Sequence, residues 1–261
     1  MDEEVGEGKE RVATHLAPDR STVNEYPARW TILLTVNGGF YDFFQNWWAH
    51  YKRLNMTNTV VVVAEDDAVY AKLQSNSNLT VERSQLTDAG PQTYETPGYN
   101  RMVSTRAQHI LRHLRAGEDV LYTDVDTVWR SDPTPHLGVA YDLTLQLDAP
   151  KYYCTGFMAV RSNPRTIGLF ERWDEALLQK AQLNQPVCNK ILQSTEGLRH
   201  AELDKMLFPN GGEYFQHFDA KSKDAVVVVH NNYIIGHEAK KKRFQKAGLW
   251  KVVASGGWYF F

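Results

Sequence analysis

Short apolar runs alternate with amphipathic segments in the first half of the chain, and this alternation constrains the fold more than any other feature. Residues 31–36 (TILLTV) and 59–64 (TVVVVA) read as strands that are buried on both faces. Between them, aromatic residues recur at i, i+3, i+4 and i+7 from Phe40 to Leu54, which predicts a helix with one buried face. The order strand, helix, strand predicts an α/β fold, a Rossmann-like α/β/α sandwich with a mixed, mainly parallel central sheet.

The same patterns continue along the rest of the chain. Further apolar runs predict strands at 79–83, 143–148, 156–160 and 225–230. Helical periodicity predicts helices at 66–75, 101–114, 165–182, 185–193 and 237–247. Residues 88–99 are polar and contain Pro91, Pro97 and Gly98, so we expect a loop over the edge of the sheet.

Composition narrows the domain organisation and the class of partner. At 261 residues with 43% hydrophobic content, the chain can bury one sizeable core. Residues 1–29 are polar and charged, so we expect a flexible N-terminal lead or stem and then a single domain over residues 30–261. The net charge of −2 argues against a nucleic-acid partner. No apolar stretch approaches the roughly 20 residues that a membrane span needs, so no span is expected in this chain.

The stretch from Asp119 to Pro133 is the strongest chemical signal in the sequence. Its apolar run ends in Asp124 and Asp126, and alternation along a strand would place both carboxylates on the same side. Ligands bind at the carboxyl edge of open α/β sheets, and hard oxygen ligands suit Mg²⁺ or Mn²⁺ carrying a diphosphate. Alternatively, Asp124 caps the following turn. No complete glycine-rich dinucleotide or phosphate loop follows the first strand, so a nucleotide would be held by other means.

Motifs spread over most of the chain resemble those of one known family. In order, they are Asn46-Trp47, Arg106, Leu121–Trp129, Asp132-Pro133, Cys154–Ser162, Gln185 with Asn189, and His230 with Gly236, Lys240 and Gly248–Trp250. Taken together, they make residues 31–250 similar to the nucleotide-diphospho-sugar transferase family, which includes plant rhamnogalacturonan-II α-xylosyltransferases. The resemblance implies a GT-A fold for the whole domain.

The resemblance also implies a divalent metal site. Asp124 and Asp126 match the family's Asp-x-Asp motif, and His230 falls where the family places a third ligand, at the end of a late strand. A neutral imidazole is a good ligand for Mn²⁺ and a poorer one for Mg²⁺, so the expected cofactor is Mn²⁺ (or Mg²⁺). Without the resemblance, a histidine after an apolar run would be read as a core or capping residue.

Contacts to a nucleotide-sugar donor follow from the same resemblance. Lys240 would contact the diphosphate, and Arg106 would reach the nucleotide or donor, unless it forms an ion pair on the helix surface. The expected donor-binding residues are Thr35, Val36, Asn37, Arg106, Thr123, Asp124, Val125, Thr155, Gly156, Gly236 and Lys240.

Three further polar residues are expected at the reacting sugar, namely Asp148, Asn184 and Gln185. Asp148 closes a strand and would face the hydroxyls of the donor sugar, while Gln185 matches the family's polar position near the anomeric carbon. The family usually has Asp where this chain has Asn184. An amide cannot act as a carboxylate base or nucleophile, so Asn184 either serves another donor or orients a hydroxyl.

These expectations combine into a metal-dependent, retaining glycosyltransferase. The donor would be a UDP-linked sugar, with xylose, galactose and arabinose all compatible, and the acceptor a hydroxyl of a glycan or glycoprotein. The alternatives are a haloacid-dehalogenase-like phosphatase, with Asp124 as nucleophile and Asp126 as acid and base, and a nucleotide-sugar-binding module without catalysis. The resemblance favours the Golgi lumen, as the soluble part of a type II membrane protein; a chain complete as given would be cytoplasmic.

Overall fold

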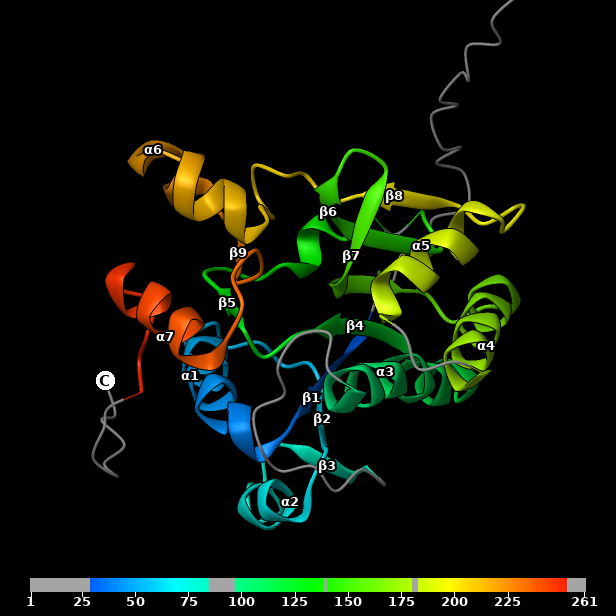
Figure 1. Ribbon diagram of the computed structural model, residues 1–261, viewed down its shortest axis with the longest axis horizontal. Coiled ribbons are helices and arrows are strands. Elements are labelled where there is room, and N and C mark those ends of the chain that lie inside the picture. Colours follow the sequence, from blue (N-terminus) through cyan, green and yellow to red (C-terminus); the bar gives the residue numbers. More distant parts are fainter. Residues whose placement is uncertain (1–28, 85–96, 139, 180–182, 253–261) are drawn as a thin grey trace, which may run out of the picture.

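The computed structural model describes residues 29–84, 97–138, 140–179 and 183–252. A seven-stranded sheet with strand order β3-β2-β1-β4-β7-β6-β8 forms its centre (Figure 1). The strands of this sheet are β1 (Trp30–Val36), β2 (Val60–Ala64), β3 (Thr80–Arg83), β4 (Asp119–Thr123), β6 (Leu143–Ala149), β7 (Tyr152–Val160) and β8 (His200–Glu202). The sheet confirms the predicted mixed, mainly parallel arrangement.

The sheet changes direction at β4. Strands β3, β2, β1 and β4 run parallel, whereas β7 pairs antiparallel with both β4 and β6. The carboxyl ends of the parallel strands therefore meet at one edge, where open α/β sheets bind ligands.

Helices cover both faces of the sheet. They are α1 (Tyr41–Lys52), α2 (Asp67–Leu73), α3 (Pro97–Arg115), α4 (Pro164–Gln179), α5 (Asn184–Gln193), α6 (Ala220–Ala225) and α7 (His237–Lys246). Single turns of 3₁₀ helix occur at Gly38–Phe40 and Thr134–His136, and a π-helical turn occurs at Glu213–His217. None of the helices in the described part of the chain is long and apolar enough to cross a bilayer.

Alternation along β1 divides the core into two layers. Ile32 and Leu34 pack with Trp47 of α1, whereas Leu33 packs with Ile110 of α3, and all five side chains are fully buried. Figure 1 shows α1 and α3 on opposite sides of β1. Full burial of one such side chain stabilises the fold by about 1.5–3 kcal/mol. The aromatic stripe of α1 is thus core packing, and its rings fix the helix that follows the ligand-binding edge.

A second, two-stranded sheet lies against the first. It pairs β5 (Thr127–Trp129) antiparallel with β9 (Val228–His230), with Thr127 opposite His230. Because β5 begins just after the acidic turn that follows β4, this pairing carries the end of β9 to the same edge of the main sheet. The small sheet therefore joins residues that lie about a hundred positions apart in the sequence.

Several sequence predictions need correction. The acidic residues follow β4 in a turn and are not part of the strand, because β4 ends at Thr123. Helix α3 begins at Pro97, so the end of the predicted 88–99 loop is helical; proline suits the first turn of a helix. Residues 88–96 and 180–182 lie outside the described residues.

The late part of the chain differs most from its prediction. The strand predicted at 225–230 is only Val228–His230 and pairs with β5 instead of extending the main sheet. The sequence analysis also missed β5, β8 and α6. Segments of three to six residues are too short for a hydrophobic period to show, so only pairing in the folded chain defines them.

Candidate active site

A cavity of about 730 Å³ opens at the carboxyl ends of β1, β2 and β4. Every predicted site residue except Thr123 lines it. The predicted residues that line it are Thr35, Val36, Asn37, Arg106, Asp124, Val125, Asp126, Asp148, Thr155, Gly156, Asn184, Gln185, His230, Gly236 and Lys240. The hydroxyl of Thr123 is fully buried and bonds to the hydroxyl of Thr127 at 2.8 Å, so the structure places Thr123 beneath the cavity.

Asp124, Asp126 and His230 converge at one point of this cavity. Backbone bonds pin the acidic turn, because Asp124 N donates to Gly156 O at 2.7 Å and Asn231 N donates to Asp126 O at 2.9 Å. Nε2 of His230 lies 3.5 Å from Asp126 Oδ1 and 3.9 Å from Asp124 Oδ2. One ligand atom from each of the three residues lies within 4.8 Å of the others. Convergence arises from the turn and from the β5–β9 pairing, not from strand alternation.

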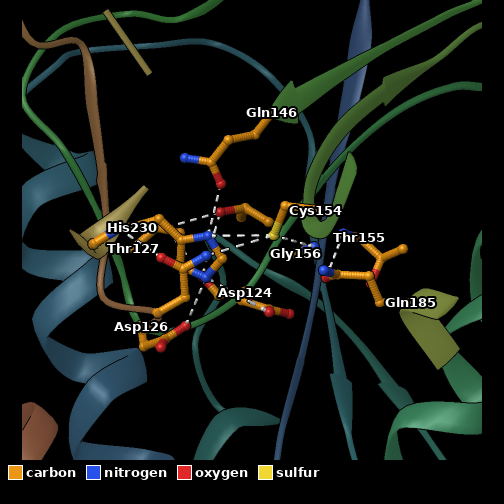
Figure 2. A network of polar contacts seen from close by, with 12 residues as sticks. Asp124, Asp126, Thr127, Gln146, Cys154, Thr155, Gly156, Gln185 and His230 are labelled. Atoms are coloured by element: carbon orange, nitrogen blue, oxygen red, sulfur yellow. Dashed lines mark hydrogen bonds and ion pairs between the residues drawn. The ribbon is translucent and has the colours of Figure 1, made fainter. Parts of the chain in front are cut away.

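Gln146 of β6 fixes the orientation of the His230 ring from the side that faces away from the two acids. The amide nitrogen of Gln146 donates to the carbonyl oxygens of Phe208 at 3.2 Å and Pro209 at 2.8 Å, so its oxygen faces the ring. That oxygen lies 2.7 Å from Nδ1 of His230. Figure 2 marks this contact between Gln146 and His230 with a dashed line. Since a carbonyl oxygen only accepts, Nδ1 carries the proton and Nε2 is the nitrogen directed at the carboxylates.

Glycine at position 156 makes room for this cluster. A Cβ atom there would lie 2.3 Å from Oδ2 of Asp124 and 2.7 Å from Cε1 of His230. Both distances are far below van der Waals contact, so any side chain would displace a ligand. The close approach of β7 to the acidic turn therefore requires Gly156.

The residues present fit a divalent cation. Two carboxylates and one imidazole nitrogen form a mixed oxygen and nitrogen donor set of the kind that Mn²⁺ accepts, and Mg²⁺ less readily. Because Nδ1 of His230 faces Gln146, Nε2 is the ring nitrogen turned toward the acids, and a partner on the other ring nitrogen is usual for a metal-bound histidine. Asp124, Asp126 and His230 could thus hold such a cation.

Cationic side chains neutralise the two carboxylates. Lys240 of α7 forms an ion pair with Asp126, and Arg106 of α3 donates to Oδ1 of Asp124 at 2.6 Å. Burial alone would raise the pKa of the Asp126 carboxyl, but the Lys240 ammonium and the His230 ring outweigh burial and hold that pKa well below its usual range. Asp126 is therefore ionised and available as a ligand throughout the physiological pH range.

Arg106 is also held by the surrounding core. It donates to the Thr155 hydroxyl at 2.9 Å, and its guanidinium lies over the Tyr122 ring at 4.8 Å from the ring centre. The Tyr122 hydroxyl donates to Asp124 at 3.2 Å and contacts the Thr35 hydroxyl at the same distance. Burial raises the pKa of Tyr122, so this hydroxyl stays protonated. Arg106 is thus a buried partner of the acidic turn, and not the surface ion pair that the sequence also allowed.

Asp148 and Gln185 form the opposite wall of the cavity. Nε2 of Gln185 donates to Asp148 at 2.8 Å, and the Gln185 oxygen accepts from Thr155 N at 3.2 Å. Asn232 donates to the other oxygen of Asp148 at 2.9 Å. Two of the three polar residues predicted at the sugar, Asp148 and Gln185, are therefore held together in the lining of the same cavity as the acidic turn.

Asn184 serves as a link between helices. Its amide nitrogen donates to the Val103 carbonyl of α3 at 3.0 Å, its oxygen accepts from the Thr155 hydroxyl at 3.5 Å, and it is only 5% exposed. A carboxylate at this position could not donate to the Val103 carbonyl. The bond to α3 gives a physical reason for an amide at position 184.

Residues of this site that sequence reasoning missed include Gln146, Asn232, Tyr233 and Glu65. Gln146 lies two positions before Asp148 on β6, so strand alternation could have placed both on one face. Glu65 follows the apolar strand β2 as Asp124 follows β4, and the same argument would have found it. For Asn232 and Tyr233, which lie between β9 and α7, the sequence gives no such signal.

Solved structures with similar folds are glycosyltransferases. The bifunctional glycosyltransferase WbbM superposes with a TM-score of 0.53 and 11% identity over 81% of this chain and 47% of that chain. A glycosyltransferase involved in glycosylating the major capsid of PBCV-1 gives a TM-score of 0.51 and 11% identity over 84% and 98% of the two chains. An active-site mutant of LgtC gives 0.50 with 14% identity over 85% and 97%. Identities this low establish the class of fold alone, the GT-A fold.

Sequence comparison identifies the family within that class. The family model for nucleotide-diphospho-sugar transferases matches residues 55–244, so this chain belongs to that family. UDP-D-xylose:L-fucose alpha-1,3-D-xylosyltransferase 1 of Arabidopsis thaliana is 29% identical over 85% of this chain and 70% of its own length. UDP-galactose:fucoside alpha-3-galactosyltransferase of Dictyostelium discoideum is 28% identical over 85% of this chain and 38% of its own length. Because the chain belongs to this family, the alternative of a haloacid-dehalogenase-like phosphatase has no support from the comparisons.

Proposed function

We propose that this protein transfers a sugar from a UDP-linked donor to a hydroxyl of a fucose-containing acceptor, with retention at the anomeric carbon. The names of the two relatives support both substrates, because one uses UDP-xylose with fucose and the other UDP-galactose with a fucoside. The observation that carries the proposal is the convergence of Asp124, Asp126 and His230 in the cavity of a family member. UDP-xylose is our first choice of donor and UDP-galactose our second.

Asp124, Asp126 and His230 would hold Mn²⁺, or less readily Mg²⁺, against the donor diphosphate. A cation bound there supplies Lewis-acid stabilisation of the charge on the departing diphosphate. Lys240 adds a second positive charge from the protein itself, since its ammonium already lies at Asp126. The backbone N–H groups at the start of α7, next to Gly236, are a further source of positive potential at the same wall.

The opposite wall would hold the sugar. Asp148 can accept from donor-sugar hydroxyls in the orientation that Gln185 and Asn232 give it. The acceptor hydroxyl would attack on the side from which the diphosphate leaves: its oxygen bonds to the anomeric carbon, the bond from that carbon to the phosphate oxygen breaks, and the proton passes to a diphosphate oxygen. Asn184 supports this route over a covalent one, because it supplies no carboxylate nucleophile and is tied to Val103.

The test uses the purified chain with Mn²⁺ and each UDP-sugar, with and without a methyl fucoside. We expect slow UDP release without acceptor, faster release with it, and an α-linked product by NMR from UDP-xylose or UDP-galactose. Chelation of the cation should stop both reactions. UDP binding without any release would instead support a binding module, while a β-linked product would exclude retention.

A further inference from the structure

The loop between β9 and α7, residues 231–236, connects two walls of the cavity. It follows His230 of the candidate metal site and leads to Lys240, which would contact the diphosphate. Midway along the loop, the Tyr233 hydroxyl donates to the backbone carbonyl of Asp148 at 2.7 Å. The middle of the loop therefore touches the wall that would hold the donor sugar, while its ends lie beside the groups that would hold the cation and the diphosphate.

Contacts on three sides fix the shape of this loop. The side chain of Asn232 accepts from Gly211 N at 2.6 Å and donates to the Asp148 carboxylate at 2.9 Å, and its carbonyl accepts from the Arg243 guanidinium. Tyr233 has a φ of 59°, which a residue with a bulky side chain rarely adopts unless its surroundings hold it there. The Tyr233 side chain is thus held in place before a ligand arrives, which lowers the entropic cost of binding.

Two large apolar side chains of the loop are open to solvent. Tyr233 is 56% exposed and Ile235 is 62% exposed, and both line the cavity. In the part of the chain that the structure describes, the other exposed large hydrophobic residues are Leu178 and Met206, and neither lines the cavity. Exposed apolar surface at the rim of a binding cavity indicates contact with a ligand.

The proposed chemistry indicates which ligand meets this surface. In the retaining route, the acceptor oxygen must lie near the anomeric carbon and also near the diphosphate oxygen that takes its proton. An acceptor in that position lies where the sugar wall and the diphosphate wall meet, and the β9–α7 loop borders both. Asp148 would hold the donor sugar and Lys240 the diphosphate, so Tyr233 and Ile235 are left to contact the acceptor.

We propose that Tyr233 and Ile235 form the acceptor subsite and select a 6-deoxy sugar by its C6 methyl group. This inference rests on the proposed function, which supplies the fucose-containing acceptor. A pyranose face that carries mainly C–H groups can pack on the Tyr233 ring, and burying the methyl group against Ile235 is favourable. The hydroxymethyl group of the corresponding hexose would lose water there without gaining a hydrogen bond from isoleucine.

Two acceptors that differ by one oxygen atom test this selection in the wild-type protein. Methyl α-L-fucoside and methyl α-L-galactoside have the same ring configuration, and only the galactoside carries a hydroxyl at C6. With Mn²⁺ and the UDP-sugar that the protein uses, we expect kcat/KM to be about tenfold higher for the fucoside, mainly through a lower KM. Equal kcat/KM values, or a preference for the galactoside, would overturn the assignment.

Ile235→Asn tests whether the loop is the source of that preference. The asparagine side chain removes the apolar contact and offers a partner to a C6 hydroxyl, and an exposed position tolerates the change. The KM for the fucoside should rise by about tenfold, while the KM for the galactoside holds or falls. The KM for the UDP-sugar should change much less. An equal rise in the KM values of donor and acceptor would place Ile235 at the donor and refute the subsite.

Leu178→Asn is the matched control. Leu178 is exposed on α4 and lies outside the cavity lining, so this variant should keep both acceptor KM values. Tyr233→Ala should raise both by roughly tenfold, as for loss of about 60 Å² of buried apolar surface, whereas Tyr233→Phe keeps the ring and should retain most of the acceptor affinity. Equal losses in the two Tyr233 variants would show that Tyr233 acts through its bond to Asp148 and not as a surface for the acceptor.

Failure of the subsite and failure of the proposed function give different results. Transfer to the fucoside that does not depend on Tyr233 or Ile235 would overturn the subsite alone. Release of UDP by the wild-type protein without transfer to either acceptor would refute the fucose-containing acceptor of the proposed function. Absence of any UDP release with Mn²⁺ would refute the proposed transferase activity itself.

Discussion

At the β4 end of the cavity, Asp126 is paired with Lys240 and Asp124 with Arg106, whereas on another wall Asp148 is held by the neutral amides of Gln185 and Asn232. The first end supplies its own positive charge and is complete as an electrostatic unit before any ligand arrives. The Asp148 wall holds its carboxylate with hydrogen bonds from two neutral amides, which fix the orientation of the carboxylate without neutralising its charge.

This difference indicates that the two regions contribute to ligand binding in different ways. Charge neutralisation at the β4 end is strong but unspecific, since any diphosphate with a cation can satisfy it. Directional hydrogen bonds at the Asp148 wall are weaker but depend on the identity of the ligand. We therefore expect catalysis to depend on the β4 end and sugar selection on the Asp148 wall, and the following variants test the β4 side of this comparison.

Asp126→Asn should have the largest effect. It keeps the shape of the side chain but removes the charge that a cation and Lys240 share, so transfer should fall by more than about a thousandfold. Asp132→Asn is the control: Asp132 caps the turn after β5 through Thr134 and lies outside the cavity lining. Near-normal transfer by Asp126→Asn with Mn²⁺ would refute the metal assignment.

Gly156→Ala should separate the geometry of the site from its charge. The added methyl group would overlap Asp124 and His230 and push two ligands apart, with all charges retained. We expect Mn²⁺ affinity and transfer to fall by roughly a hundredfold, since both depend on ligand placement within a fraction of an ångström.

Gly168→Ala is the matched control for that variant. Gly168 lies within α4, and a Cβ atom there would meet nothing within 4 Å. Activity should be unchanged and the free energy of unfolding higher by about 0.5–1 kcal/mol, which thermal melts can measure. Full Mn²⁺ affinity in Gly156→Ala would mean that the ligands do not converge as described.

Gln146→Leu tests whether the hydrogen bond to Gln146 sets the tautomer of His230. Loss of the oxygen that faces Nδ1 frees the ring to turn, so Mn²⁺ affinity should fall by roughly ten- to a hundredfold. Gln146→Glu restores an acceptor for Nδ1 but, like the leucine variant, loses the bonds to Phe208 and Pro209. Mn²⁺ affinity should therefore recover in Gln146→Glu; equal losses in the two variants would show that Gln146 acts only through stability.

The parts of the cavity also differ in how far the sequence predicted them. Apolar runs long enough to show a pattern predicted β1, β2 and a strand that leads to the acidic pair, although the acids lie in a turn after that strand, and the parallel order of these strands places their ends together. The position of His230 depends on the pairing of β5 with β9, two three-residue strands that carry no detectable period. The family resemblance, not the residue pattern, suggested His230 as a ligand.

Some site features are absent from any local pattern. The role of Asn184 depends on the Val103 carbonyl, which lies 81 positions earlier in the chain. Thr123 shows the converse, because the family resemblance suggested a donor contact while the fold buries its side chain beneath the cavity. The resemblance therefore predicted the cavity lining well, but the direction of the Thr123 side chain depends on the folded strand.

Lys240→Met should have the smallest effect and should change two affinities in opposite directions. Lys240 competes with a cation for Asp126, so its removal leaves a buried carboxylate uncompensated and should increase Mn²⁺ affinity several-fold. The same change removes a positive charge from the wall that would face the diphosphate, so UDP affinity at saturating Mn²⁺ should fall by about tenfold. Lys242→Met, on an exposed neighbour outside the cavity lining, should change neither affinity. A parallel loss of both affinities in Lys240→Met would mean that Lys240 supports the structure of the β4 end, and the view of that end as a self-neutralised unit would fail.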